Sequence, residues 1–293
     1  MTRNVGIFYF SGTGNTRALS SLLCNHFLEK GIACETIDIS PLLKNGIVPE
    51  IEKYDLIGIG YPVYGSNCPN PVISFVDTLS LCNKPVFLFK DGGTLTFGGG
   101  PNTNIKEKLQ AKEMHVIYED AYIMPANSMR KDPPELIKCL MNIALFKAHM
   151  LVSDLVDHKE KHQHNPALVK FYAHIMSKVE SNISSDFSSG LVANQKCIKC
   201  SKCIRECPQN NVFQAEGQIR FGNDCLMCLK CIYNCPVKAI ESTKVKKFVL
   251  DEFYNIDKIM SDDNIKVDIE KIKRIKMPKE VKAYIGRYTN PSI

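Results

Sequence analysis

Eight cysteines fall into two matched runs in the last third of the chain. The runs are CIKCSKCIRECP, over residues 197–208, and CLMCLKCIYNCP, over residues 225–236. In each run two intervals of two residues and one of three separate the cysteines, and a proline follows the last. Three cysteines at such short intervals can wrap one iron–sulfur cubane, while the fourth reaches the neighbouring cluster. The spacing therefore predicts two [4Fe–4S] clusters.

Zinc and disulfides are the alternatives for these cysteines. A zinc ribbon uses two C-x-x-C pairs with a longer loop between them, which leaves half of these cysteines without a role. The N-terminus, MTRNVGIFYF, has no signal-peptide cleavage site, so we expect a cytoplasmic protein whose thiols stay reduced. The scattered cysteines are expected to be small core residues: Cys24, Cys34, Cys68, Cys82 and Cys139.

A second motif lies near the N-terminus, between a strand-like run over residues 5–10 and an amphipathic helical run. It consists of Ser11, Gly12, Thr13, Gly14, Asn15 and Thr16. A glycine- and hydroxyl-rich loop that opens a helix offers backbone N–H groups and the positive end of the helix dipole to a phosphate. The dinucleotide fingerprint fits poorly because Arg17 replaces its third glycine, and no P-loop lysine follows. A plain glycine turn remains the alternative.

Further strand-like runs follow at residues 34–39, 54–60, 84–90 and 115–124. Helical runs separate them around residues 70–80 and 103–112, which predicts a five-stranded parallel sheet with helices on both faces. The loops over residues 61–71 and 90–102 follow the carboxyl ends of the third and fourth strands, where doubly wound sheets bind their ligands.

Residues 1–160 resemble the flavodoxin family through FSGTGNT, YPVYG and the glycine-rich loop after the fourth strand. The resemblance implies a flavodoxin-like doubly wound α/β domain with bound FMN, its phosphate on residues 11–16. The flavin ring would lie between the two later loops. Tyr64 is the favoured stacking residue because the chain has no tryptophan, although plain packing is an alternative for it. The implied ring-loop contacts are Pro62, Val63, Tyr64, Gly65, Gly92, Gly93 and Phe97.

Residues 191–243 resemble the bacterial ferredoxin module with two [4Fe–4S] clusters, a small α+β domain. The resemblance implies that one cluster is held by Cys197, Cys200, Cys203 and Cys235. The other would be held by Cys207, Cys225, Cys228 and Cys231. A hairpin is expected around Glu216-Gly217. The sequence departs from the module where glycine or another small residue is common, at Lys199, Ser201, Met227 and Leu229.

Four segments follow from these patterns: a flavodoxin-like domain (1–160), a helical linker (161–190), a ferredoxin domain (191–245) and a C-terminal extension (246–293). Asp132 is expected to cap the last helix of the first domain. The polar run after that helix, with His158, His162 and His164, is interpreted as a solvated linker rather than a metal site. A helix of the extension is expected to pack over a neighbouring domain.

The composition, with 44% hydrophobic and 23% charged residues, is that of a soluble protein, and no apolar run is expected to span a membrane. The formal charge is +6, but bound FMN and clusters would offset it. Nucleic-acid binding is therefore not favoured. Basic residues beside the cysteines would instead dock a redox protein with an acidic surface: Lys199, Lys202, Arg205 and Lys230.

The whole chain resembles the flavodoxin–ferredoxin fusions of anaerobic bacteria and archaea, which are iron–sulfur flavoproteins. The resemblance implies electron transfer, with single electrons passing between low-potential partners and FMN through two [4Fe–4S] clusters. The alternative is an FMN-dependent reductase of a small molecule, such as a quinone, fed by the clusters. Its candidate proton donors are Asp91, Tyr61 and Cys68, so the sequence leaves open whether the chain is an enzyme.

Overall fold

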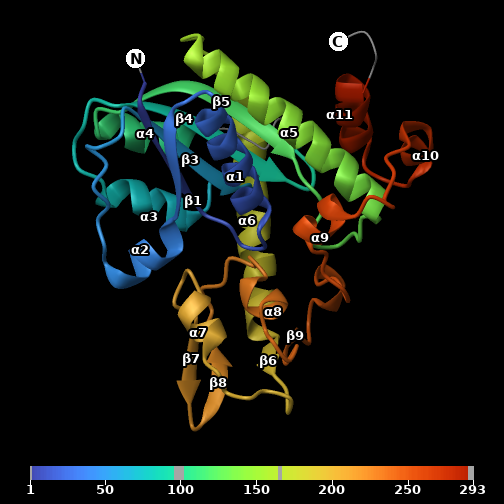
Figure 1. Cartoon of the computed structure of the whole chain (residues 1–293). Coiled ribbons are helices and arrows are strands. Elements are labelled where there is room, and N and C mark those ends of the chain that lie inside the picture. The colour runs from blue at the N-terminus through green and yellow to red at the C-terminus, as the bar shows by residue number, and fades with distance from the viewer. Residues whose placement is uncertain (1, 96–101, 164–166, 290–293) are drawn as a thin grey trace.

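The computed structural model describes residues 2–95, 102–163 and 167–289. Its N-terminal half alternates strands and helices (Figure 1). The strands are β1 (Asn4–Tyr9), β2 (Ala33–Asp38), β3 (Leu56–Pro62), β4 (Pro85–Gly92) and β5 (His115–Ile123). The helices are α1 (Asn15–Glu29), α2 (Ile39–Asn45), α3 (Asn70–Thr78), α4 (Thr103–Ala111) and α5 (Pro134–Val156).

The five strands form one parallel sheet in the order β2-β1-β3-β4-β5. This is the strand order of flavodoxin-like doubly wound folds, in which the order reverses between β1 and β3. The predicted fold class is therefore confirmed, with its strands and the helices near residues 70–80 and 103–112 in place. The reversal creates a crevice at the carboxyl ends of β1 and β3, where ligands of such sheets bind.

Helices cover both faces of the sheet because side chains alternate along each buried strand. Ile7 points into a core shared with α1 and α5, and the next residue, Phe8, points into a core shared with α3 and α4. Both side chains are almost fully buried. The two cores make the sheet a rigid platform for the loops at its carboxyl edge.

Helix α5 departs from the prediction at its start. Pro133 occupies the N-cap position, and no side chain caps the helix. Asp132 instead accepts a hydrogen bond from the Ala126 N–H at 2.8 Å and pairs with Arg130 at 2.6 Å. The predicted cap is wrong because this carboxylate turns back to brace the loop that precedes the helix.

Helix α5 is also long and apolar enough, by length and composition alone, to cross a membrane, contrary to the expectation from the sequence. However, 56% of its most apolar window is buried inside the molecule. Its inner face supplies Met141, Ala144, Ala148 and Leu151 to the core over the sheet. This burial is that of a helix that packs in the core of the molecule.

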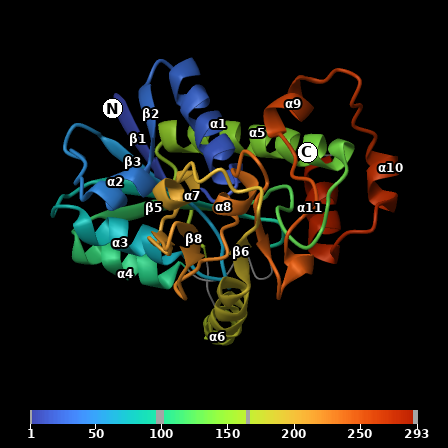
Figure 2. The same ribbon diagram turned by 90° about the horizontal axis from the view of Figure 1, so that it is seen from below.

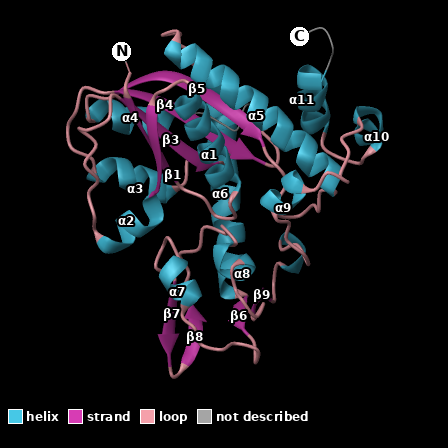
Figure 3. Ribbon diagram, in the orientation of Figure 1, coloured by secondary structure: helices cyan, strands magenta, loops and turns pink. Residues whose placement is uncertain are grey.

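The C-terminal half contains short elements after one long helix (Figure 3). They are α6 (Ala167–Ser189), β6 (Leu191–Ala193), α7 (Lys202–Glu206), β7 (Val212–Ala215), β8 (Gln218–Phe221), α8 (Lys230–Tyr233) and β9 (Ile240–Ser242). Strands β7 and β8 form the predicted hairpin, and β6 pairs with β9. Glu216 and Gly217 both have positive φ (51° and 68°), as a two-residue hairpin turn of the primed type requires.

These short elements lie below the carboxyl edge of the large sheet, with α6 running alongside as a spine (Figures 1 and 2). Ser184 and Ser188 of α6 donate hydrogen bonds to the carbonyls of Cys225 and Gly222. Lys230 of α8 reaches Asp38 at the end of β2, with 3.6 Å between ammonium and carboxylate. The cysteine-rich half is thus fixed against the sheet.

The chain ends in a 3₁₀ turn (Lys246–Phe248) and the helices α9 (Ile256–Ser261), α10 (Ile269–Arg274) and α11 (Lys279–Thr289). Ile272, Val281 and Ile285 of this extension pack in one apolar cluster with Leu136 and Leu140 of α5. The extension therefore lies on the flavodoxin-like half.

The polar run before α6 does more than link two segments. Lys161 pairs with β5 as an isolated bridge, since its carbonyl accepts from the Glu119 N–H at 2.8 Å and its N–H donates to the Ile117 carbonyl at 3.1 Å. It thereby covers part of an edge strand. Among the three histidines of this region, His164 lies outside the described residues.

Candidate cofactor sites

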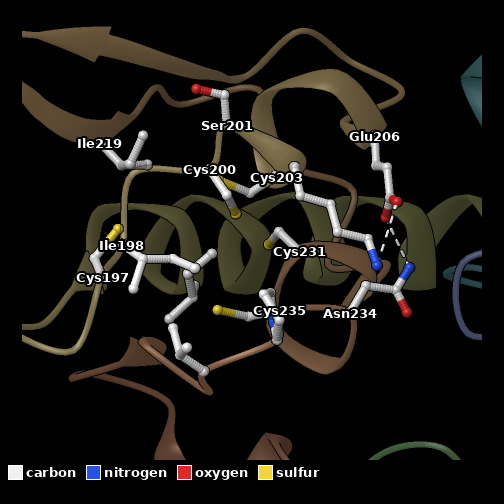
Figure 4. A pocket seen from close by; sticks show the side chains of 14 residues that line it. Cys197, Ile198, Cys200, Ser201, Cys203, Glu206, Ile219, Cys231, Asn234 and Cys235 are labelled. Atoms are coloured by element: carbon white, nitrogen blue, oxygen red, sulfur yellow. Dashed lines mark hydrogen bonds and ion pairs between the residues drawn. The ribbon is translucent and has the colours of Figure 1, made fainter.

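Five cysteines line a pocket inside the C-terminal half, together with Ile198, Ile219 and Asn234. Figure 4 shows Cys200, Cys203, Cys231 and Cys235 directing their sulfurs toward a common space, with Cys197 at its side. The empty space amounts to about 380 Å³, part of it open to solvent. This first cysteine pocket contains the whole of one predicted ligand set, including Cys235 from the second run.

A second cysteine pocket lies next to the first, with about 400 Å³ of empty space. It is lined by Cys207 from the first run and by Cys225, Cys228 and Cys231 from the second. The structure therefore exchanges the fourth cysteine of each run between the two pockets. This is the crossover that the ferredoxin resemblance implies.

The two runs also share an unusual backbone conformation at matched positions. Lys199 and Met227 have φ of 55° and 51°, and Ser201 and Leu229 have φ of 58° and 60°. Residues other than glycine rarely adopt this left-handed conformation, which costs roughly 1–2 kcal/mol each. The matched φ values show that both loops bend in the same way around their cysteines.

Backbone N–H groups point at the sulfurs in the same repeated manner. The Asn211 N–H donates to Cys207 Sγ at 3.3 Å, and the Ala239 N–H donates to Cys235 Sγ at 3.2 Å. Such bonds stabilise thiolates and tune the potential of a cluster that they hold.

Burial opposes charge on the deepest thiols of the second pocket. It raises the pKa of the Cys228 thiol to about 12 and the pKa of Cys231 well above its usual value, and the neighbouring cysteines raise both further. Four thiolates in such a place need a strong positive charge to balance them, which bound iron supplies. The donor set therefore fits iron–sulfur clusters.

Within the described ranges, no three histidine, cysteine, aspartate or glutamate side chains converge on a point that could hold a single metal ion. A cubane makes a different demand, because each of its thiolates binds a different iron corner. A cluster therefore needs sulfurs arranged around a common space, and the cysteines are arranged in this way around the two pockets.

The largest of the cavities described here lies at the carboxyl edge of the sheet, with about 1720 Å³ of empty space by the same measure as the cysteine pockets. This flavin pocket, as we call it, has an enclosed cavity volume of about 770 Å³, within the range of roughly 300–1,000 Å³ common for cofactor sites. Its lining includes Pro62, Val63, Tyr64 and Gly65 after β3, Gly92 and Gly93 at the end of β4, and Asn15 at the start of α1. Phe97, the other predicted ring contact, lies outside the described residues.

The predicted phosphate loop adjoins this pocket. In the described part of the chain, the backbone N–H groups of Gly12, Thr13 and Asn15 have no hydrogen-bond acceptor. The first turn of α1 carries no acidic side chain, and Arg130 and Lys276 line the pocket. Unpaired N–H groups at a helix N-terminus beside cationic side chains fit a phosphate.

The hydroxyls of this loop are mostly engaged within the protein. Ser11 accepts from the Gly14 N–H at 3.1 Å, Thr13 accepts from the Asn127 amide at 2.8 Å, and Thr16 donates to Asp91 at 2.5 Å. Of residues 11–16, only Asn15 is on the pocket lining, so a phosphate would depend on the backbone more than on the predicted hydroxyls.

The three candidate proton donors are placed very differently. Asp91 lines the flavin pocket, and burial raises its pKa to about 7. Tyr61 is 1% exposed and donates to Asn102 at 2.7 Å, and Cys68 lies against the Pro69 carbonyl. Neither is among the described residues that line the pocket, so of the three candidates only Asp91 is placed at it. The side chains of Tyr61 and Cys68 belong to the packing beneath the loops.

Three parts of the flavin pocket were absent from the sequence prediction. They are the loop after β5 (Ala126–Arg130), the cysteine-bearing loop Leu226–Leu229, and Lys276–Pro278 of the extension. The first follows the carboxyl end of a strand, so the rule that identified the other loops could have found it. The other two come from distant sequence and have no local signal.

The basic residues expected to dock a partner are partly used within the chain. Lys230 pairs with Asp38, Lys202 lies 3.8 Å from Glu206, and Arg205 donates to the Cys200 carbonyl at 2.9 Å. Lys199 and the nearby Lys196 are exposed. The basic surface beside Cys200 is therefore smaller than the sequence suggested.

No protein-family model matches the chain. An uncharacterized protein of Methanocaldococcus jannaschii is 30% identical over 69 residues, which are 24% of this chain and 46% of that protein, so the match spans about half of the relative.

Among solved structures, oxidised flavodoxin 2 of Bacillus cereus is 17% identical and covers 53% of this chain and 99% of its own, with a TM-score of 0.40. A flavodoxin from the domain Archaea is 17% identical, covering 53% and 97%, with a TM-score of 0.37. Rubredoxin oxygen:oxidoreductase of Desulfovibrio gigas is 18% identical, covering 52% and 37%, with a TM-score of 0.35. The strand order and the two helical layers, rather than these likenesses, assign the N-terminal half the flavodoxin-like α/β fold.

Proposed function

We propose that this chain is an electron-transfer protein that binds FMN and two [4Fe–4S] clusters and exchanges single electrons with low-potential redox partners. FMN supplies one- and two-electron chemistry and each cluster one-electron chemistry, while the protein positions and tunes them. Cys197, Cys200, Cys203 and Cys235 would hold the first cluster. Cys207, Cys225, Cys228 and Cys231 would hold the second, and the flavin pocket would hold FMN.

One observation carries the proposal: the three candidate sites adjoin in a row. Cys231 lines both cysteine pockets, and Cys228 lines both the second cysteine pocket and the flavin pocket. Each neighbouring pair of sites is therefore separated by a shared side chain rather than by a layer of protein. Such a row is what one-electron exchange between bound redox groups requires.

The row is open at its first end. Cys200, which lines the first cysteine pocket, is exposed, and so is Ile198 beside it, at 62%. In the middle of the row, Leu229, which lines both the second cysteine pocket and the flavin pocket, is buried at 3% exposure. A protein partner would therefore exchange electrons at the first cysteine pocket.

The test is an anaerobic potentiometric titration of the reconstituted protein, following flavin absorbance and cluster EPR together. We expect one FMN and about eight iron atoms per chain, and flavin reduction in single-electron steps with one couple overlapping the clusters. A reconstituted protein that retains neither flavin nor iron would overturn the proposal.

A small-molecule reductase is the second candidate, and Asp91 is the observation that favours it. Its carboxyl lines the flavin pocket, and a pKa of about 7 suits proton transfer near neutral pH. In this case the same titration would show the flavin taking two electrons at once, well above the clusters in potential. The search would then turn to a small acceptor.

A further inference from the structure

The loop Leu226–Leu229 separates the second cysteine pocket from the flavin pocket. Leu226, Cys228 and Leu229 line both pockets, and Met227 lines the flavin pocket. The loop is therefore a wall shared by the two pockets. If its backbone changes conformation in the second cysteine pocket, the shape of the flavin pocket changes as well.

The backbone conformation of this wall is unfavourable for the loop in isolation. Met227 and Leu229 have left-handed φ values of 51° and 60°, on either side of Cys228. Both side chains are also buried, at 6% and 3% exposure. A strained backbone persists only where its surroundings hold it, and bonds from Cys225 and Cys228 to iron are the strongest restraint available here.

The wall is pressed against the flavodoxin-like half. Leu226 and Cys228 pack on the core between the sheet and α3. Gly12 of the phosphate loop approaches so closely that a Cβ on it would lie 2.6 Å from the Cys228 carbonyl oxygen. A side chain at this position would displace either the phosphate loop or the wall, so the two cannot move independently.

The equivalent loop of the first cysteine run has the same backbone conformation but is exposed to solvent. Lys199 and Ser201 are left-handed, yet Cys200 and Ile198 are exposed. No residue of this loop lines the flavin pocket. The two runs therefore provide an internal control, with equivalent ligand loops of which one alone touches the flavin site.

We infer that FMN binding is coupled to the second [4Fe–4S] site and not to the first. This rests on the proposed function, since it takes both groups as ligands of this chain. Iron bound to the second set holds the wall in its left-handed shape and thereby completes the flavin pocket. By reciprocity, bound FMN stabilises the iron of the second set by the same factor.

The test compares two double variants at equivalent positions. Cys207→Ser/Cys225→Ser removes two ligands of the second set, and Cys235→Ser/Cys197→Ser removes two of the first. None of these four cysteines lines the flavin pocket. Each variant is reconstituted with iron anaerobically, and its FMN dissociation constant is measured by quenching of flavin fluorescence. We expect a rise of about tenfold or more for the first variant and less than about twofold for the second, relative to wild type.

Equal FMN affinities in the two variants would overturn the inference while leaving the proposed function intact. A wild-type protein that binds no FMN or no iron would instead overturn the proposed function.

A second measurement uses the wild-type chain and does not depend on how the variants fold. Iron loss to a chelator is followed with and without saturating FMN, by the absorbance of the clusters. We expect FMN to slow the loss of about half of the iron and to leave the other half unchanged. An equal effect of FMN on all of the iron, or no effect, would contradict the coupling.

Discussion

A buried carboxyl at the flavin pocket makes the stability of the flavin-free protein depend on pH. Burial raises the pKa of Asp91 to about 7, so the folded state binds a proton that the unfolded state has released above about pH 4. Stability is therefore highest when the group is protonated and falls as the pH rises toward 7. The Thr16 hydroxyl, at 2.5 Å, offsets only part of the burial cost.

We expect Asp91→Asn to remove this dependence, because an amide keeps the acceptor for Thr16 and carries no charge. Between pH 5 and pH 8 the free energy of unfolding of wild type should fall by about 2 kcal/mol more than that of the variant. Urea unfolding of both proteins at the two pH values measures the difference. Parallel pH profiles would show that Asp91 is ionised throughout this range.

The left-handed residues of the cysteine loops give a second prediction for single residues. Ser201 has φ of 58°, a conformation that glycine adopts freely. Ser201→Gly should therefore raise the free energy of unfolding by about 1 kcal/mol, measured by urea unfolding of the metal-free protein. The control is Ser185→Gly, at an exposed position near the C-terminal end of α6, where glycine should instead destabilise by about half as much. Destabilisation by both would show that φ at Ser201 carries no strain.

At the scale of structural elements, one segment connects the cysteine-rich half to the flavodoxin-like half near the flavin pocket. The ring of Phe253 stacks on Tyr233 of α8 with centroids 4.3 Å apart, and on the other side contacts Tyr254 at 4.5 Å. The single O–H of Tyr254 lies within hydrogen-bond distance of two acceptors, Asn15 Oδ1 at 3.0 Å and the Pro125 carbonyl at 2.9 Å. This strap, residues 248–254, thus ties the second cysteine run to the N-terminus of α1.

Tyr254→Phe removes the hydroxyl that joins Asn15 and the Pro125 carbonyl, from a side chain that is partly buried. Because Asn15 lines the flavin pocket, we expect FMN affinity to fall about threefold to tenfold, with an unfolding cost of about 1–2 kcal/mol. Flavin fluorescence quenching and urea unfolding measure the two effects. Tyr288→Phe on α11, which does not line the pocket, is the control and should leave the affinity unchanged.

The contacts of the strap are of a kind that could not be predicted from the sequence. Strand-like apolar runs alternating with helical runs over residues 5–124 predicted the sheet, since each strand and helix is specified by its own buried side chains. The ligand crossover followed from a resemblance in spacing. By contrast, contacts such as Tyr254 with Asn15 or Gly12 with Cys228 join residues far apart in sequence, and no local pattern encodes them. Asp132 failed as a cap for a related reason, because a partner outside the helix competed for its carboxylate.

At the scale of the whole molecule, a protein partner that docks at the first cysteine pocket would meet the charged side chains beside it. Lys196 and Lys199 are exposed on the same loop as Cys197 and Cys200, which line the first cysteine pocket. Electrostatic attraction between opposite charges mainly raises the rate of association and weakens with salt. We therefore expect electron exchange with a small acidic ferredoxin to slow as ionic strength rises.

Lys196→Glu/Lys199→Glu reverses the charge of this surface without touching a cysteine. We expect the second-order rate of electron exchange with the acidic ferredoxin to fall about tenfold at low salt and to lose most of its salt dependence. Stopped-flow absorbance at several ionic strengths measures this rate. Lys279→Glu/Lys282→Glu on α11 makes the same change in net charge on the extension, where both lysines are exposed. An equal loss of rate in both variants would mean that total charge, not the surface beside Cys200, governs the encounter.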